Sequence, residues 1–310
     1  MHIPSGSRLV IAYNAHSSRA NSLKELLFDK LDAAHYKYER LEILQASLEE
    51  NVAHLKDAFR PGDIILCAAG DGSAHALVHG LLAAGQPNVQ VGFLAYGNFN
   101  DLARTFNTKP TLRDPVAFLH EAEVESLYPL RVVADGVELR RALLYVTIGW
   151  TARAAQCFDA PTVRAKIQAG RAHLPYSLWK IGLFYLRSRK LSVLPPFVLD
   201  ARLRKRLTDI MCVNGPRVAR LFRTRRRYYR RPVFLYKKLN VRSLILNLPF
   251  LLRSVFLMMP GKEKIQIEMD FVSPSSLPLQ CDGEVIELTN ISRLQVKKSR
   301  TALSVLTTKH

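Results

Sequence analysis

The sequence predicts an α/β domain followed by a β-rich domain. Over the first hundred residues, strand-like apolar runs alternate with segments of helical periodicity, which is typical of parallel βαβ units. From about Ser126 the pattern changes to short strands around turns, so we place a boundary near residue 125. A chain of 310 residues with 48% hydrophobic and 23% charged residues can bury two cores, which argues against disorder.

The individual elements follow from composition and periodicity. Runs rich in strand formers predict strands at Leu9–Tyr13, Asp63–Ala69, Val89–Leu94, Leu191–Leu199 and Lys264–Phe271. Apolar residues at spacings of three and four predict a helix over 23–34 and another from Ser73, and a helical region is expected over Ala160–Arg189. The stretch after Ser126 predicts two strands joined by a turn at Asp135-Gly136.

The segment LCAAGDGSAHALVHGLL, residues 66–82, predicts a buried strand, a glycine turn and an amphipathic helix. Gly70 and Gly72 allow backbone N–H groups to approach an anion, and the start of a helix adds partial positive charge. Ser73 is the expected N-cap. Asp71 can act through a divalent cation or through ribose or hydroxyl contacts. It can also serve only as a cap in a plain strand-to-helix turn, and the motif alone leaves both interpretations open.

Two further segments carry candidate functional residues. VGFLAYGNFNDLARTF, residues 91–106, again predicts a strand, a glycine turn and a helix start. Its Asn100 and Asp101 can cap that helix or bind a ligand, and Arg104 can meet a phosphate. LQCDGEVIEL, residues 279–288, places Asp282 and Glu284 around a glycine in a strand-like segment. By itself this pattern is more typical of a solvated hairpin than of a catalytic site.

Charge and cysteine content narrow the class of protein. The formal net charge of +19 favours association with a polyanion, whether nucleic acid, an anionic bilayer or a phosphorylated ligand. The four scattered cysteines show no CxxC spacing, which predicts reduced thiols in a cytoplasmic compartment. The short apolar run near the N-terminus does not predict a signal peptide. The four-residue spacing of His75 and His79 suits a metal, but we expect only an exposed helix face there because no third ligand is near.

In this order, the GDGS turn, the GNFNDLAR turn and the late DGE resemble the diacylglycerol kinase catalytic-domain family, which includes bacterial lipid kinases and sphingosine and ceramide kinases. The resemblance covers nearly the whole chain. Asn14 falls where the family has its first-strand turn, and DIMCVNG, residues 209–215, matches a strand that ends in an Asn-Gly turn. The closing SRLQVKKSRTALSVL, residues 292–306, looks like the terminal strand that returns to the first domain.

The resemblance implies a two-domain fold. Residues 1–125, completed by about 290–310, would form an α/β nucleotide-binding domain similar to those of phosphofructokinase and NAD kinase. Residues 126–289 would form a β-sandwich lipid-binding domain with a helical insertion and a basic segment. An NAD kinase itself would share the GDG turn, but the DGE segment and the basic second domain are not its pattern.

The resemblance also implies the site and its chemistry, with ATP and Mg²⁺ as cofactors. The nucleotide site would comprise Asn14, Gly70, Asp71, Gly72, Ser73, Gly97, Asn98, Asn100, Asp101 and Arg104. Glu284, with Asp282 beside it, would take the proton from a lipid hydroxyl, and Asp71 is a candidate contact for the magnesium ion. The structural metal of some relatives is expected to be absent, because no acidic residue occurs between Asp209 and Glu263.

The chain departs from the family pattern at several positions. Ala69 replaces a glycine, Ser73 a threonine and Ala76 a common glutamate. In the second turn a proline and a threonine are lost, and Asn98 and Phe99 stand in that turn. These departures bear on whether the protein turns over its substrate.

The basic segment 216–242 has three interpretations: a nucleic-acid patch, a patch for anionic headgroups or a solvated loop. The apolar stretch Leu244–Met259 is too short and too interrupted to span a bilayer, but its position just after the segment favours membrane docking. The docking residues would be Arg223, Arg225, Arg226, Arg227, Arg230 and Arg231. The expected protein is a cytoplasmic lipid kinase, peripheral at the inner face of the membrane, with a diacylglycerol-like substrate by default. The alternatives are a degenerate member that binds lipid or nucleotide without turnover, and a nucleic-acid-binding protein.

Overall fold

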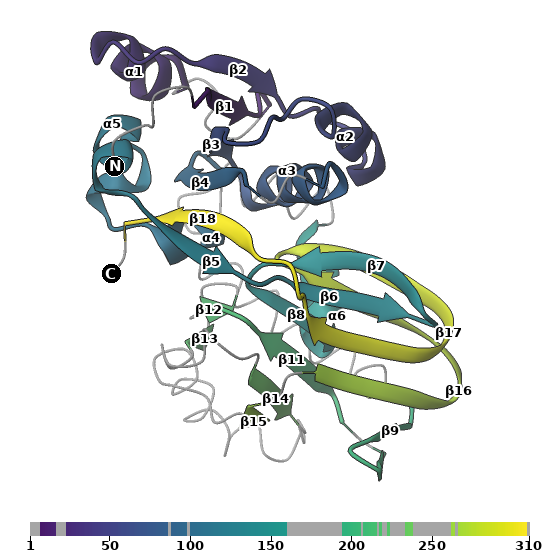
Figure 1. Cartoon of the computed structure of the whole chain (residues 1–310). Coiled ribbons are helices and arrows are strands. Elements are labelled where there is room, and N and C mark those ends of the chain that lie inside the picture. The colour runs from purple at the N-terminus through teal and green to yellow at the C-terminus, as the bar shows by residue number, and fades with distance from the viewer. Residues whose placement is uncertain are drawn as a thin grey trace. The chain divides into compact units, whose positions relative to one another are not determined.

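The computed structural model describes residues 7–16, 23–85, 88–97, 100–159, 194–205, 207–215, 217–218, 222–223, 233–237, 262–263 and 266–308. The chain divides into two compact units (Figure 1). Unit 1 comprises Met1–Pro129 and Arg300–His310, and unit 2 comprises Leu130–Ser299. The C-terminal segment therefore returns to the unit in which the chain began.

Unit 1 contains the α/β sheet that the sequence predicts. Its six described strands run in the order β2 (Glu39–Glu42), β1 (Leu9–Tyr13), β3 (Ile64–Ala69), β4 (Gln90–Ala95), β18 (Leu303–Thr307) and β5 (Glu123–Leu127). All neighbouring strands are parallel except β18 and β5. The closing strand of the sequence thus lies between β4 and β5, inside the sheet of unit 1. The predicted strands at 9–13, 63–69 and 89–94 are confirmed to within a residue.

The helices of unit 1 follow the strands in the predicted alternation. They are the π-helical turn η2 (Lys24–Phe28) with α1 (Asp29–Ala33), α2 (Leu48–Leu55), α3 (Asp71–Ala83), α4 (Asp101–Phe106), the 3-10 turn η3 (Pro110–Leu112) and α5 (Pro115–Glu121). Apolar residues of η2, α1 and α5 pack on one face of the sheet, against β1, β3 and β4. The prediction that Ser73 caps its helix was wrong: α3 begins at Asp71, and Gly70 is its N-cap.

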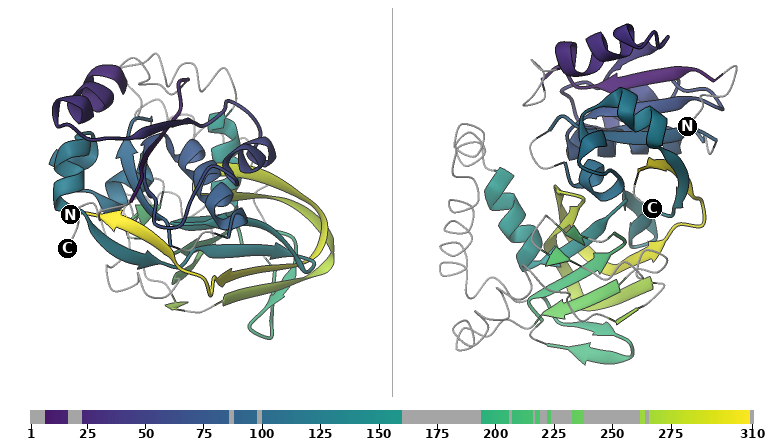
Figure 2. Two further views of the ribbon diagram at one scale, coloured as in Figure 1. Left: turned by 45° about the horizontal axis from the view of Figure 1, so that its top comes forward. Right: turned by 90° about the vertical axis from the view of Figure 1, so that its left-hand side faces the viewer.

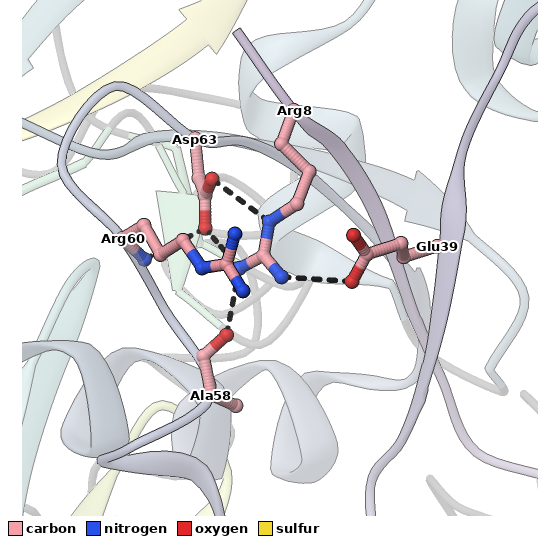
Figure 3. A network of polar contacts seen from close by, with 5 residues as sticks. All are labelled: Arg8, Glu39, Ala58, Arg60 and Asp63. Carbon is pink, nitrogen blue, oxygen red and sulfur yellow. Dashed lines mark hydrogen bonds and ion pairs between the residues drawn. The ribbon is translucent and has the colours of Figure 1, made fainter.

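An ion pair ties the amino ends of two central strands together (Figure 3). Arg8 precedes β1, and its guanidinium donates to both oxygens of Asp63, the residue before β3, over 3.1 and 2.6 Å. The same guanidinium donates to Glu39 and to the carbonyl of Ala58. The side chain of Asp63 is only 2% exposed, so its negative charge is balanced by Arg8 and by the N–H of Arg60 and not by water.

Unit 2 is built on an antiparallel sheet. Among its described residues the main strand order is β15 (Lys262–Glu263), β14 (Val233–Lys237), β11 (Asp209–Val213), β8 (Tyr145–Gly149), β16 (Gln266–Cys281), β17 (Glu284–Lys298), β6 (Leu130–Ala134) and β7 (Val137–Ala142). The hairpin β9 (Phe197–Leu199) and β10 (Arg202–Arg204) joins the sheet through β16, and the short strands β12 (Arg217–Val218) and β13 (Phe222–Arg223) pair separately. Helix α6 (Trp150–Asp159) contacts β8, β16 and β17. The strands β16 and β17 curve as they run (Figure 2).

Two turns expected from the sequence of unit 2 are present in this sheet. The turn at Asp135-Gly136 joins β6 to β7 with φ of 47° and 86°, the left-handed geometry of a tight hairpin. β11 ends at Asn214-Gly215 as expected. The helical region Ala160–Arg189 and the apolar stretch Leu244–Met259 lie outside the described residues. Within the part of the chain that the structure describes, no helix is long and apolar enough to cross a membrane.

The cysteines match the prediction of reduced thiols where they are described. Cys67, Cys212 and Cys281 are buried free thiols, while the side chain of Cys157 lies outside the described part. Burial raises the pKa of the Cys67 and Cys212 thiols well above the usual range, which disfavours the reactive thiolate.

Candidate active site

Three turns of unit 1 meet at one edge of its sheet. Asn14 follows β1, Gly70 follows β3, and Gly97 lies just beyond β4. These three strands are adjacent and parallel, so their carboxyl ends share an edge, which is where ligands bind in open α/β sheets. The sequence-predicted nucleotide residues that the structure describes therefore converge on this edge.

A side-chain hydrogen bond joins the first turn to the second. The Asn14 amide Nδ2 donates to Ser73 Oγ over 2.8 Å, and the Asn14 Oδ1 accepts from the His16 N–H over 2.8 Å. Ser73 therefore uses its hydroxyl to bind Asn14 across the sheet edge and not to cap its own helix. This bond is a contact that a serine keeps when it replaces a threonine, because both carry the hydroxyl.

The second and third turns approach closely through glycine backbones. A Cβ added to Gly97 would lie 2.2 Å from the Gly70 Cα and 2.9 Å from its nitrogen, so no other residue fits at this position. The Asn100 side chain closes the third turn by accepting from the Gly97 N–H and donating to its carbonyl, over 2.6 and 2.5 Å. Asn100 is 2% exposed and takes the left-handed backbone at φ 55°, which asparagine tolerates.

Asp71 connects the two helix starts. Its carboxylate oxygens accept from the backbone N–H groups of Asp101 and Leu102 over 3.0 and 3.1 Å. Asp71 is therefore bound to the first turn of α4, while its own backbone forms the first residue of α3. Asp71 therefore does cap a helix, as one of the two interpretations held. The capped helix is α4, thirty residues further along the chain, and not the helix that Asp71 itself begins.

The phosphate-binding interpretation fits the start of α3. A Cβ added to Gly72 would meet nothing within 4 Å, and the residue is exposed beside the N-terminus of a 13-residue helix. Gly70, the N-cap, has no side chain that could satisfy the first N–H groups of the helix. An exposed glycine at the start of a helix suits the binding of a phosphate.

The structure describes some of the remaining predicted residues of this edge and leaves others out. Asp101 and Arg104 lie in the first turns of α4 and are half-buried. Asn98 and Phe99 lie outside the described residues. The expectation that His75 and His79 form an exposed face was wrong for His75, which is 1% exposed. Its Nε2 lies 3.1 Å from the Nε2 of the half-buried His79.

Two departures from the family pattern have a structural explanation in this chain. Ala69, the last residue of β3, is not among the described residues with positive φ, so its Cβ meets no backbone strain. Ala76 is 6% exposed on the packed side of α3. A glutamate at that position would require burial of a charge in this fold.

The carboxylates of the late DGE motif belong to unit 2 and have distinct surroundings. Asp282 is 5% exposed in the tight turn between β16 and β17, with φ 47°. Its carboxylate accepts three backbone N–H groups, those of Leu143, Leu144 and Tyr145. These bonds fix the turn to residues Leu143, Leu144 and Tyr145, which lead from β7 into β8. The sequence gives no sign of these three donors, because they lie about 140 residues from Asp282.

Glu284 is the half-buried first residue of β17, directly opposite Cys281. Since directly opposed residues point to the same side of a sheet, Glu284 shares the face of Cys281, which belongs to the buried core of unit 2. The structure thus separates the two carboxylates: Asp282 holds the turn, and Glu284 is displayed on the strand that leaves it.

The chain combines an α/β unit, whose glycine turns gather at the carboxyl edge of a parallel sheet, with an antiparallel unit. Residues 8–132 match the family model of the diacylglycerol kinase catalytic domain. The match covers the three turns of unit 1 and ends in β6.

Solved structures show the same fold over the whole chain. A candidate diacylglycerol kinase from Bacillus anthracis str. Sterne superposes with a TM-score of 0.69 at 13% identity, covering 96% of both chains. A structure described as a diacylglycerol kinase from the same organism gives a TM-score of 0.68 at 12% identity, covering 97% of both. A search of curated protein sequences finds no match.

Proposed function

We propose that this protein transfers the γ-phosphoryl group of ATP to the hydroxyl of a lipid, with a diacylglycerol-like molecule as the default substrate. The observation that carries the proposal is the convergence of Asn14, the Gly70–Ser73 turn and the Gly97–Asp101 turn in a diacylglycerol kinase catalytic domain. Kinases of this family use ATP, and the edge supplies the glycine backbones and the helix start that phosphates require.

In this proposal the described residues of unit 1 hold the nucleotide. The N–H groups at Gly70–Ser73 would bind its phosphates, Asn14 and Ser73 would orient them through their shared hydrogen bond, and Arg104 would supply positive charge. Asp71 connects the second turn to the helix that follows the third turn, and Asn100 closes the third turn. Phosphoryl transfer depends mostly on positioning and charge neutralisation, which these residues would provide.

Glu284 is the proposed general base. A carboxylate accepts the proton of the lipid hydroxyl as that oxygen attacks the γ-phosphorus, and ADP leaves with the electrons of the broken P–O bond. Asp282 is better suited to hold the turn, because its oxygens already accept three backbone N–H groups. We therefore assign proton transfer to Glu284 and the placement of Glu284 to Asp282.

Magnesium would enter with ATP. Within the described ranges no group of three or more His, Cys, Asp and Glu side chains is arranged to hold a metal ion. An ion bound mainly by nucleotide phosphates needs few protein ligands, and Asp71 is the candidate carboxylate at this edge. When bound, the ion would neutralise phosphate charge during transfer.

The proposed place of action is the surface of an anionic membrane. The net charge of +19 supports this, together with the run from Arg223 to Arg231, whose side chains lie outside the described residues. Each Lys or Arg near an anionic surface contributes about 1 kcal/mol to binding. Association should therefore weaken as salt is raised.

The proposal is tested by incubating the purified protein with γ-labelled ATP, magnesium and vesicles that contain diacylglycerol and an anionic phospholipid. Label should enter the organic phase, should fail to enter it in the presence of EDTA, and should be lost in Glu284→Ala. A folded protein that binds these vesicles and ATP but transfers no label would support the degenerate alternative.

A further inference from the structure

The edge strand β7 places an arginine near the proposed base. β7 ends at Ala142, and the N–H groups of the next three residues bind the Asp282 carboxylate. Asp282 is separated from Glu284 by one glycine. Arg140, two residues before the end of β7, is therefore a close neighbour of the turn that presents Glu284. Figure 1 shows the end of β7 beside the start of β17.

The strand register puts Arg140 on the same side of the sheet as Glu284. Arg140 is directly opposite Val132, a fully buried member of the unit 2 core, and Glu284 is directly opposite Cys281 of the same core. Opposed residues share a face, so both side chains point to the side that this core occupies. β7 also contacts β16 although two strands, β17 and β6, separate them in the sheet, which shows that the sheet curls around that side.

A β-bulge gives Arg140 this orientation. The register between β6 and β7 shifts between Val132 and Val133, so that Leu139 is the extra residue of β7. Leu139 packs against the core, and the half-buried Arg140 donates from Nη1 to the Leu139 carbonyl over 2.9 Å. A bulge is a common device for redirecting a side chain beside an active site.

The neighbouring charges of β7 point the other way. Arg141 is directly opposite Arg131, and both guanidiniums bind Glu138, the Arg131 Nε at 2.6 Å from the carboxylate. This three-residue cluster occupies the outer face. Arg141 is therefore a natural control for Arg140: it is the adjacent residue and the same amino acid, but it belongs to the opposite face.

We propose that Arg140 is a positioning residue that binds the Glu284 carboxylate and keeps it ionised and correctly oriented for proton transfer. The inference rests on the proposed function for its catalytic meaning, while the pairing itself can be tested without it. Both groups also act electrostatically on the buried Cys281 thiol, whose pKa is raised by burial first, then by Asp282 and Glu284, and is lowered in part by Arg140.

Asp282 in the turn and Cys281 on the facing strand are titratable neighbours of Glu284. Asp282 in the turn is held by its three N–H donors, and the Cys281 thiol stays protonated. On the other face, Gln156 Nε2 of α6 donates to Glu287 over 2.9 Å. Arg140 is thus the described cation of β7 that shares a face with Glu284.

The first test is the pH dependence of lipid phosphorylation in Arg140→Met, Arg140→Lys and the control Arg141→Met. An arginine beside a carboxylate lowers its pKa by about 1–3 units, so its removal should move the acid limb of kcat to higher pH by about one unit or more. Arg140→Lys should keep most of the wild-type profile, and Arg141→Met should not move the limb. An unchanged acid limb in Arg140→Met would overturn the proposal.

The second test needs no activity. Urea unfolding midpoints are compared for Arg140→Met, Glu284→Gln and the double variant, with Arg141→Met plus Glu284→Gln as the matched pair. The Arg140 pair should give a double variant less destabilised than the sum of its single variants, and the Arg141 pair should be additive. Additive shifts for Arg140 and Glu284 would refute the pairing. A wild-type protein without lipid phosphorylation would refute the proposed function instead, and the urea result would still decide the pairing.

Discussion

Gly72 and Gly97, at the carboxyl edge of the unit 1 sheet, differ in what an added methyl group would meet. At Gly72 a Cβ has open space, and alanine suits a helix better than glycine, so Gly72→Ala should unfold at an equal or slightly higher temperature. If the turn binds phosphate, however, the methyl group would stand where the ligand approaches. We expect ATP affinity, measured by calorimetry, to fall about tenfold or more, which corresponds to about 1.4 kcal/mol.

The matched substitution Gly97→Ala should behave in the opposite way. Its Cβ would lie 2.2 Å from the Gly70 backbone, so the two turns must separate and the melting temperature should fall markedly. If Gly72→Ala binds ATP as tightly as the wild type while remaining folded, the turn does not hold the phosphates.

At the scale of single residues, the sequence predicted which positions gather at the edge but not what each side chain does there. Asn14, Ser73 and Asp71 could be chosen from their place after predicted strands, because parallel strands end at one edge. The partner of Asp71 could not be predicted, since the two N–H groups it binds become its neighbours only when β3 and β4 pair. The burial of His75 was missed for the same reason: helical spacing does not reveal which neighbouring elements cover a face.

At the scale of elements, Asp71 should matter for the stability of α4. That helix has six residues, and its N-cap Asn100 makes no side-chain bond to it. The Asp71 carboxylate instead accepts the N–H groups of Asp101 and Leu102 in its first turn. Asp71→Ala should lower the unfolding free energy by about 1–2 kcal/mol. Asp71→Asn, which keeps one carbonyl oxygen, should cost less. Hydrogen exchange at Asp101 and Leu102 should accelerate in the alanine variant, and unchanged exchange would contradict the capping role.

The stabilising effect of Asp114, the N-cap of α5, should depend on pH. Asp114 caps α5 by accepting from the N–H groups of Val116 and Ala117, and it binds Lys30 of α1. Burial alone would raise the pKa of this carboxyl, but the bonds from Lys30 and from the helix N–H groups outweigh it, so the pKa is lowered.

A lowered folded-state pKa means that the stabilising effect is present above the unfolded value, near 3.9, and is lost as pH falls through the folded pKa. The Asp114 side chain is 31% exposed and that of Lys30 is 41% exposed, so solvent screening limits the charge contribution to a fraction of about 1 kcal/mol. In urea unfolding, Asp114→Asn should keep the cap but unfold more easily than the wild type at pH 6, and the difference should shrink below about pH 3. A difference that stays constant down to pH 2 would exclude the charge effect.

The elements themselves were mostly predictable in unit 1 and less so in unit 2. Continuous apolar runs such as Leu9–Tyr13 and Ile64–Ala69 are typical of strands that are buried on both faces, and both runs form interior strands of the sheet. The segment Gln266–Cys281 was expected only as a shorter strand, Lys264–Phe271. Its continuation past Ser273 and Pro274 depends on irregular pairing with β17, which local propensity does not indicate.

At the scale of the whole molecule, the C-terminal segment should be essential for unit 1. β18 lies between β4 and β5 inside the sheet, and Leu303, Val305 and Leu306 are buried. A chain truncated after Ser299 would leave β5 without its neighbour and expose the side of β4. We expect it to aggregate or to lose the cooperative thermal transition of unit 1, measured by calorimetry. A truncated chain with the wild-type transition would contradict this role of β18.

The central claim of the proposed function is that Glu284 takes the proton from the lipid hydroxyl. Steady-state kinetics of Glu284→Gln in the lipid phosphorylation assay test it most directly, because glutamine keeps the shape and removes the base. The account predicts a kcat lower by about 10²–10⁴-fold with a nearly unchanged KM for ATP. A kcat close to the wild-type value in the folded variant would contradict it.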